Sequence, residues 1–343
     1  MVRRATIQDV ATAANVSVAT VDRVLNGRMK VREETARRVM EAARSVGYHA
    51  AGLIAQRVRS GQRRLRFGFV LHKEKQSFYQ TMVQEIHAAA AQMDGVIAEV
   101  VIRFSPSHAP ADFAAQLLSL RDKVDAVAAI AISHHTVTNA VAELQSAGIP
   151  VFALLNDFAQ GVRQAYVGMN NLKIGRIAGY MAATAAPRTG KITVFVGGHR
   201  WHGHELRETG FRSYFREYAP QFTVLDTLVN LETRALTYEA TLDLLARHPD
   251  LRGIYVAGGG MEGAIAALRE VRQPGEVALV INELTPESRA ALSDRYAVMV
   301  IGTPVARMCR DVLDLMSRTA QNGLVDISAQ YFLAPDLFLP ESV

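Results

Sequence analysis

The sequence predicts a small all-α head joined by a hinge to an α/β body of two lobes, each built on a parallel, doubly wound sheet. Three observations predict this: apolar residues at helical period over the first fifty positions, a connector rich in alanine and arginine, and short apolar runs alternating with amphipathic helices from Leu65 onward. Such alternation is typical of parallel strands with crossover helices. We expect the head at residues 1–48, the hinge at 49–64 and the body at 65–343.

The composition is that of a globular chain, with 343 residues of which 49% are apolar and 21% charged. The single cysteine excludes an internal disulfide and a multi-cysteine metal site. No apolar run approaches the roughly 18 to 20 residues of a membrane span, and the N-terminus lacks the apolar core of an export signal. We therefore expect a chain of the reducing cytoplasm, without a membrane anchor.

The net charge of +5 is unevenly divided along the chain. Residues 1–66 hold 14 basic and 5 acidic side chains, which gives that segment +9, while the remainder carries −4. A basic head on a mildly acidic body predicts a polyanionic partner for the head alone. Charge by itself would fit a solvated basic face equally well.

Three short helices, with a tight turn between the first two, are predicted in the head. Thr6 and Asp9 have the spacing of a capping box before apolar residues that recur at helical period. Ser17 is placed to cap a second helix, which Asn26 and Gly27 end. A third amphipathic helix follows. This arrangement is a helix-turn-helix unit, whose second helix enters the major groove of DNA in proteins that use it.

The segments TIQDVATAANVSVATVDRVLNG and VREETARRVMEAARSVGY resemble the DNA-binding head of the lac and gal repressor family over residues 5–48. By that resemblance Val18 and Ala19 lie at the groove floor, and Arg23 reads a base. The chemistry agrees, because apolar side chains suit a thymine methyl group and arginine can bond guanine O6 and N7 together.

Asp22 departs from the resemblance, since the family usually carries a small hydroxyl residue there. Its carboxylate would either repel phosphate or orient Arg23, and the sequence leaves both roles open. Ser17 and Thr20 would contact phosphate. The candidate DNA-binding residues of the head and hinge are Thr6, Ser17, Val18, Ala19, Thr20, Asp22, Arg23, Asn26, Gln56, Arg57 and Val58.

The connector HAAGLIAQRVRSGQRR has the composition of a linker that orders on contact. Members of the resembling family carry a hinge helix here, which enters the minor groove and inserts a leucine between base pairs. The resemblance places Val58 as the wedge, with Gln56 and Arg57 beside it. A plain flexible tether is the alternative.

The body is predicted to form two similar lobes, with the chain crossing between them near residues 155–166 and again near 281–298. Ligands of such sheets bind outside the carboxyl ends of the strands. The predicted strands are Leu65–Leu71, Ala126–Ile132, Val151–Leu155, Lys191–Val196, Gly253–Ala257, Val277–Ile281 and Val298–Gly302.

Polar and aromatic side chains follow these strands, as a site for a hydroxylated ligand requires. Carboxylates, amides and guanidinium groups pair with hydroxyls, and an aromatic ring covers an apolar sugar face. The candidate effector-binding residues are Lys73, Phe78, Tyr79, His134, Asn156, Asp157, Asn170, Trp201, Arg207 and Glu283.

The body also resembles, more loosely, the effector domain of the same family, which shares its fold with periplasmic sugar-binding proteins. Phe78 and Tyr79 stand where the family has an aromatic pair, Arg207 matches an arginine that holds ligand hydroxyls, and Glu283 falls where an aspartate is usual. Gly258–Gly260 replaces the usual Asn-Asp pair, so one polar contact is missing. We expect this glycine run to be a tight strand-to-helix turn.

The resemblance implies a ligand-responsive transcription regulator, most simply a repressor, that binds a palindromic operator as a homodimer in the cytoplasm at the nucleoid. A sugar, polyol or sugar acid would be its effector. The alternatives are a solute-binding protein without DNA regulation, a regulator of a non-sugar ligand, and an α/β enzyme.

We expect no enzyme, because the sequence contains neither G-x-S-x-G nor H-E-x-x-H. We also expect no cofactor and no metal. His199, His202 and His204 share one loop but lack the spacing of a partner carboxylate.

Overall fold

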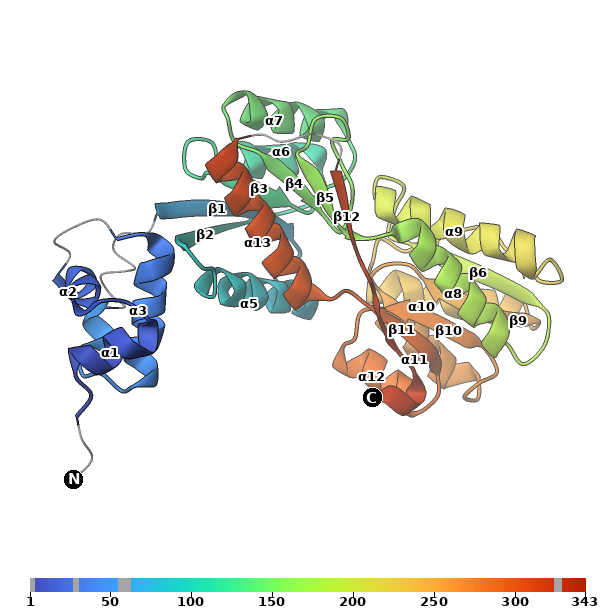
Figure 1. The fold of residues 1–343 in the computed structure, drawn as a ribbon. Coiled ribbons are helices and arrows are strands. Elements are labelled where there is room, and N and C mark those ends of the chain that lie inside the picture. The colour runs from blue at the N-terminus through green and yellow to red at the C-terminus, as the bar shows by residue number, and fades with distance from the viewer. Residues whose placement is uncertain (1–3, 27–30, 55–62, 324–328) are drawn as a thin grey trace. The chain divides into compact units, whose positions relative to one another are not determined.

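The computed structural model describes residues 4–26, 31–54, 63–323 and 329–343. The chain divides into two compact units, residues 1–65 with 90–99, and residues 66–89 with 100–343. Figure 1 follows the elements along the chain. Within the described ranges no helix combines the length and the apolar character needed to cross a bilayer.

The head contains the three predicted helices, α1 (Ile7–Ala14), α2 (Val18–Asn26) and α3 (Glu33–Ser45). Both predicted caps are confirmed: Thr6 and Asp9 form a capping box, and the Thr20 amide donates to Ser17 Oγ at 3.2 Å. The apolar stripes meet in one small core, whose fully buried members include Val10, Val21, Val39, Ala43 and Ile54.

The first sheet of the body has the strand order β12-β5-β4-β3-β1-β2. Its strands are β1 (Arg63–His72), β2 (Val96–Ser105), β3 (Ala126–Ala129), β4 (Val151–Leu154), β5 (Ala165–Met169) and β12 (Ala329–Leu333). The helices of this lobe are α5 (Ser77–Ala91), α6 (Pro110–Leu118), α7 (His135–Ser146) and α13 (Val305–Asn322) (Figure 1). Strands β1, β3, β4, β5 and β12 pair in parallel along this order.

The second sheet has the order β13-β11-β10-β9-β6-β7, and β8 pairs with β6. Its strands are β6 (Lys191–Val196), β7 (Thr223–Val224), β8 (Leu228–Val229), β9 (Leu251–Val256), β10 (Ala278–Asn282), β11 (Ala297–Gly302) and β13 (Asp336–Phe338). The helices are α8 (Asn171–Ala185), α9 (His202–Tyr218), α10 (Arg234–Arg247), α11 (Met261–Val271) and α12 (Pro286–Ser293). Only the β11–β13 pair is described as antiparallel.

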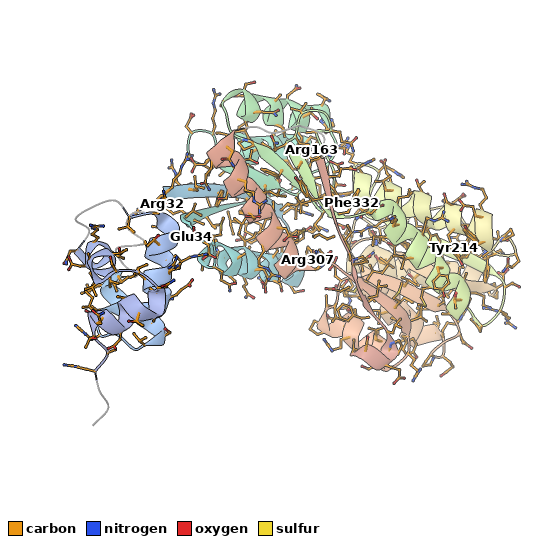
Figure 2. The ribbon with its side chains drawn as sticks, viewed as in Figure 1. Arg32, Glu34, Arg163, Tyr214, Arg307 and Phe332 are labelled. Atoms are coloured by element: carbon orange, nitrogen blue, oxygen red, sulfur yellow. The ribbon has the colours of Figure 1, made fainter. Side chains whose placement is uncertain are left out.

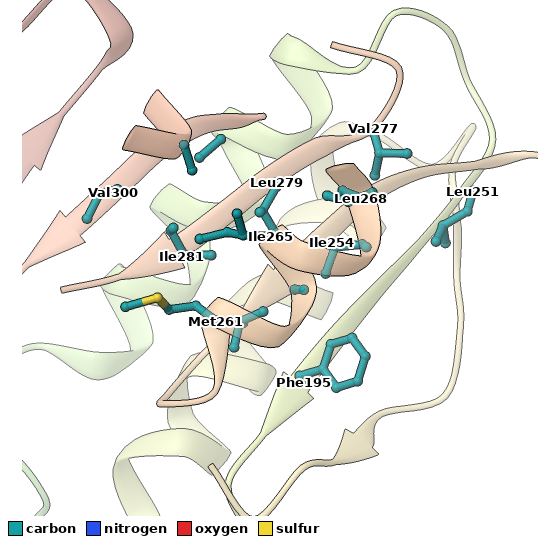
Figure 3. Close-up of a cluster of buried hydrophobic side chains, with 14 of the residues drawn as sticks. Phe195, Leu251, Ile254, Met261, Ile265, Leu268, Val277, Leu279, Ile281 and Val300 are labelled. Carbon is teal, nitrogen blue, oxygen red and sulfur yellow. The ribbon is translucent and has the colours of Figure 1, made fainter. Parts of the chain in front are cut away.

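Buried side chains fill both faces of the second sheet. One core lies under α11, where Ile254, Leu279 and Ile281 pack against Ile265 and Leu268 (Figure 3). The other joins the strands to α8 and α9 through residues such as Ala178, Phe211, Phe215 and Tyr255. A sheet covered on both faces explains why its strands read as continuous apolar runs.

The two-lobed α/β fold is confirmed, and all the predicted strands are present with ends shifted by a few residues. The predicted crossings at 155–166 and 281–298 are wrong. Strand β5 still belongs to the first sheet and β11 to the second, so the chain crosses after Met169, after Gly302 and between β12 and β13. Sequence patterning missed this because β5, β12 and β13 are short, and β12 and β13 lie at the edges of their sheets.

Candidate functional site

A cavity of about 310 Å³ lies between the two lobes, at the carboxyl ends of their strands. In each sheet it opens where the strand order reverses, beside β1 and β3 in one lobe and β6 and β9 in the other, which is where such folds bind ligands. Side chains from both lobes line it, among them His72, Phe78, Tyr79, Asn156, Trp201, His204, Arg207, Glu232, Asn282, Glu283 and Thr303.

Arg207 projects from α9 into this cavity and is only 8% exposed. Its Nε donates to Asn171 Oδ1 at 2.7 Å, and its Nη1 donates to the Ala257 carbonyl at 2.6 Å. Among the described residues no ion pair joins this guanidinium to a carboxylate. The protein therefore fixes two of its nitrogens and leaves Nη2 to bond a ligand.

Glu283 and Asn282 follow each other at the end of β10. Both Glu283 oxygens accept from Thr303, at 2.7 Å from the hydroxyl and 3.0 Å from the amide. Burial raises the pKa of Glu283 more than these bonds lower it. The Asn282 Nδ2 donates to the Val256 carbonyl at 2.8 Å, while its buried Oδ1 has no partner. A ligand with a hydroxyl group would supply the missing donor.

A buried ion pair joins the lobes at the edge of the cavity. Lys73 Nζ, just after β1, donates to Glu232 Oε2 at 2.5 Å, and both side chains are less than one-fifth exposed. Glu232 Oε1 accepts from the Gly259 amide at 3.2 Å and lies 3.8 Å from His204 Nε2. Burial alone would raise the pKa of Glu232, but His204 and Lys73 outweigh burial and hold it below its usual range.

The glycine run after β9 makes room for this carboxylate. A Cβ on Gly258 would lie 2.6 Å from His204 Cε1 and 2.9 Å from Glu232 Oε1. Gly260 begins α11 with a φ of 91°, so the expected tight strand-to-helix turn is confirmed. Glu232 thus brings a carboxylate to the place where the sequence lacks an Asn-Asp pair.

His72 anchors an aromatic cluster that reaches across the lobes. Its ring stacks on Trp201 at 4.9 Å between centroids, with 27° between the planes, and lies edge-on to His108 at 5.2 Å. Its Nε2 is hydrogen-bonded to the Tyr79 hydroxyl. Burial lowers the pKa of His72 to about 3, although the Glu232 carboxylate acts to raise it. The ring is therefore neutral near pH 7.

The remaining nitrogen of His72, Nδ1, is buried without a partner. If the Tyr79 hydroxyl donates to Nε2, as its hydrogen-bonding capacity favours, Nδ1 carries the proton. His72 then offers a donor from the first lobe, and Asn282 an acceptor from the second.

Six of the predicted effector residues line the cavity: Phe78, Tyr79, Asn156, Trp201, Arg207 and Glu283. Lys73 reaches it through Glu232. Trp201 is 6% exposed, with His72 against one face. Asn156 spans the lobes, because its Oδ1 accepts from the Gly203 amide at 2.7 Å and its Nδ2 donates to the Ala131 carbonyl at 2.5 Å.

Three predicted effector residues lie outside the cavity, each held by a structural contact. His134 caps α7 through a bond from the Thr136 amide, and Asn170 caps α8. Asp157 forms a buried, bidentate ion pair with Arg163, which is labelled in Figure 2. A loop position after a strand was the only signal for these three. Helix capping explains that position for His134 and Asn170, and the ion pair with Arg163 explains it for Asp157.

The DNA-binding candidates of the head lie mostly on one side of α2. Ala19, Arg23 and Asn26 are exposed, whereas Val18 is half-buried and packs against the head core. The hydroxyls of Ser17 and Thr20 lie 2.9 Å apart at the start of the helix. Gln56, Arg57 and Val58 lie outside the described residues.

His72, His108, His204, Glu232 and Asn282 are absent from the predicted effector site, and His204 was weighed from the sequence only as a metal ligand. They come from β1, from the loop before α6, from α9, from the loop before α10 and from β10. The described residues contain no group of three histidine, cysteine or acidic side chains placed to hold a metal ion.

Comparison with known proteins gives two family matches. Residues 67–323 match the periplasmic binding protein domain family, and residues 6–50 match the family described as bacterial regulatory proteins, lacI family. The HTH-type transcriptional regulator GalS of Salmonella typhimurium is 25% identical over 346 residues, covering 98% of this chain and 96% of that protein. The HTH-type transcriptional regulator GntR of Pseudomonas aeruginosa is 25% identical over 283 residues, covering 81% and 79%.

Two solved structures resemble the body. An ABC transporter periplasmic solute binding protein from Actinobacillus succinogenes with bound D-allose has a TM-score of 0.73 at 17% identity, covering 81% of this chain and 98% of that chain. A solute binding protein from Agrobacterium vitis bound with α-D-tagatopyranose has a TM-score of 0.73 at 20% identity, covering 81% and 95%. These likenesses confirm the fold, and the curated relatives are regulators rather than enzymes. The chain belongs to the lacI family of bacterial regulatory proteins, as a ligand-responsive transcription regulator whose body is a periplasmic binding protein domain.

Proposed function

We propose that this regulator is a repressor that binds a palindromic operator as a homodimer, and that a sugar, polyol or sugar acid in the interlobe cavity changes its affinity for DNA. The observation that carries the proposal is the cavity itself, which is shared by two lobes and lined by unsatisfied polar atoms, on a chain that also holds a helix-turn-helix head. A two-fold dimer matches a palindromic site because one head alone contacts only a half-site. Such a protein would work at the nucleoid.

The polar atoms facing the cavity suit a ligand with several hydroxyl groups. Asn282 Oδ1 needs a donor, while Arg207 Nη2 and His72 Nδ1 need acceptors. A hydroxyl group is both donor and acceptor, and the ring of Phe78 offers an apolar surface beside these atoms. The sugars bound by the two similar solute-binding proteins are the first compounds to try.

The effector would act through contacts that join the two lobes around the cavity. The ion pair Lys73–Glu232 and the stack of His72 on Trp201 both join one lobe to the other. A ligand that binds one arrangement of the lobes more tightly shifts the population towards it. By linkage, the effector and the operator then change each other's affinity by the same factor.

Effector binding is expected to change the fluorescence of Trp201, the only tryptophan of the chain. The ring lines the cavity against His72, so a ligand alters its surroundings. A titration with hexoses, pentoses, polyols and sugar acids should give a saturable change for one class. The same compound should raise the stability of the body by about 2.7 kcal/mol at one hundred times its Kd. Trp201→Phe should lose the signal and keep a thermal shift. Silence in both measurements across the panel would contradict the effector proposal.

Arg23→Ala is expected to weaken operator binding by about 10- to 100-fold, since a bidentate contact to guanine is worth about 1–3 kcal/mol. Binding to unrelated DNA should fall far less, because there the side chain supplies only charge. Fluorescence anisotropy at fixed salt measures both affinities. Arg37→Ala, which removes an exposed arginine from α3, is the matched control. Equal losses in the two variants would refute the assignment of α2 as the reading helix.

A further inference from the structure

The exposed face of α2 carries a carboxylate among the residues proposed to meet DNA. Ala19, Arg23 and Asn26 are exposed and Asp22 is half-buried, whereas Val21 on the opposite side is fully buried. Residues three and four apart share a face of a helix, so these four side chains form one surface. An arginine on this surface is attracted to DNA phosphates. A carboxylate is repelled by them, so Asp22 needs a different role in DNA binding.

Asp22 is paired with Asn26 rather than with Arg23. The Asn26 Nδ2 donates to Asp22 Oδ1 at 2.6 Å. A carboxylate can only accept, so the amide nitrogen must face it. Within the described part of the head no ion pair joins Asp22 to Arg23. Of the two roles that the sequence left open, orientation of Arg23 therefore has no support in the geometry.

Few groups in the major groove can satisfy this carboxylate. The donors presented there are the exocyclic amines, cytosine N4 and adenine N6. Adenine holds the acceptor N7 beside N6, which would repel a carboxylate, whereas cytosine presents no acceptor on that edge. Cytosine is thus the base that fits best, and it is the base complementary to the guanine that an arginine reads.

We propose that Asp22 is a specificity-determining residue that selects a cytosine in each half of the operator, an inference that rests on the proposed DNA-reading role of α2. Where the cytosine amine is present, the carboxylate gains a donor. Where it is absent, the carboxylate keeps only its bond from Asn26, lies close to phosphates without a donor from the DNA, and binding is weakened. Asp22 therefore separates specific from unspecific sites by repulsion as well as by attraction.

The test selects binding sites from a randomised duplex library with the full-length protein and with Asp22→Asn, which keeps the shape of the side chain and removes its charge. Asp22→Ser is the second variant. Glu41→Gln removes an exposed carboxylate from α3 and controls for the loss of one negative charge in the head. We expect the wild type to enrich cytosine at one position of each half-site. Both Asp22 variants should reduce that preference by about tenfold, keep the rest of the motif and bind unrelated DNA more tightly.

An unchanged motif in both Asp22 variants overturns the inference and leaves the reading role of α2 intact. The same loss of preference in Glu41→Gln would assign the effect to net charge, and would also overturn it. A wild-type protein that enriches no sequence at all overturns the proposed operator binding itself. The failure of the inference and the failure of the proposed function are therefore distinguishable.

Discussion

Gly175→Ala is expected to lower the free energy of unfolding of the body by about 3 kcal/mol, towards the upper end of the usual cost of overpacking. Gly175 lies on α8 where that helix meets α9, and a Cβ there would lie 1.9 Å from the Arg207 carbonyl oxygen. Gly210 makes the reciprocal approach, 2.1 Å from the Leu172 carbonyl oxygen. Because both obstacles are helix backbone, no rotation of a side chain relieves the clash, and the two helices must separate.

The same substitution should weaken effector binding, because the close approach of α8 and α9 positions Arg207. The bond from Arg207 Nε to Asn171 Oδ1, at 2.7 Å, runs from α9 to α8 and lengthens when the helices part. Thermal unfolding followed by Trp201 emission measures the stability of the body alone, since the head contains no tryptophan. Titration of the effector measures the second effect.

Two other glycines calibrate the Gly175 experiment. On the same helix, a Cβ on Gly179 would lie 3.0 Å from the Cβ of Tyr214, which is labelled in Figure 2, so the overlap is much smaller than the 1.9 Å approach at Gly175. Gly179→Ala should therefore cost less. Nothing lies within 4 Å of a Cβ on Gly52, in the helical turn at 51–54, so Gly52→Ala should be neutral or slightly stabilising for the head, which circular dichroism follows because Trp201 reports only on the body. Equal losses at Gly175 and Gly179 would show that backbone contact is not the cause.

The length and burial of a strand decided whether the sequence could predict it. Strands such as β6 and β9 are buried on both faces and read as apolar runs. Strand β12 lies at the edge of its sheet and exposes three of its five residues. Its sequence therefore shows neither a continuous apolar run nor a regular alternation of apolar and polar residues. Strands β7 and β8 have two residues each, too few for any period. Missing β5 and β12 misplaced the lobe crossings, because both belong to the first sheet.

Residues that line the cavity could be predicted where the family resemblance or the position after a strand was informative. Arg207 and Glu283 could be placed by the family resemblance, and Phe78 and Tyr79 by their position after β1. Glu232 could not, because its partner Lys73 lies 159 positions away. Its signal in the sequence is indirect. The glycine run at 258–260 leaves a space that side chains from elsewhere must fill, and only the fold shows that Glu232 and His204 fill it.

Acidification from pH 6.5 to about pH 4 is expected to destabilise the body. In the unfolded chain His72 and His204 bind protons below about pH 6.5, but burial lowers their pKa values in the folded chain to about 3 and about 4. Between these limits the unfolded state holds more protons than the folded state. Each histidine therefore lowers the free energy of unfolding by about 1.4 kcal/mol for every pH unit of acidification. Glu232 adds to the loss below about pH 4.5, because its pKa is lower in the folded chain than in the unfolded chain.

The slope of the melting temperature against pH, followed by Trp201 emission, tests this reasoning. His72→Gln should lower stability at neutral pH, because its contacts with Tyr79 and Trp201 are changed, and should also flatten the profile between pH 6.5 and 4. His87→Gln removes an exposed histidine of α5 and should leave the slope as in the wild type. A His72→Gln profile that merely runs parallel to the wild type would mean that His72 gains its proton in the folded protein as readily as in the unfolded chain. Burial between the lobes would then not govern the charge of His72. The proposal that a neutral His72 ring contacts the effector would also be wrong.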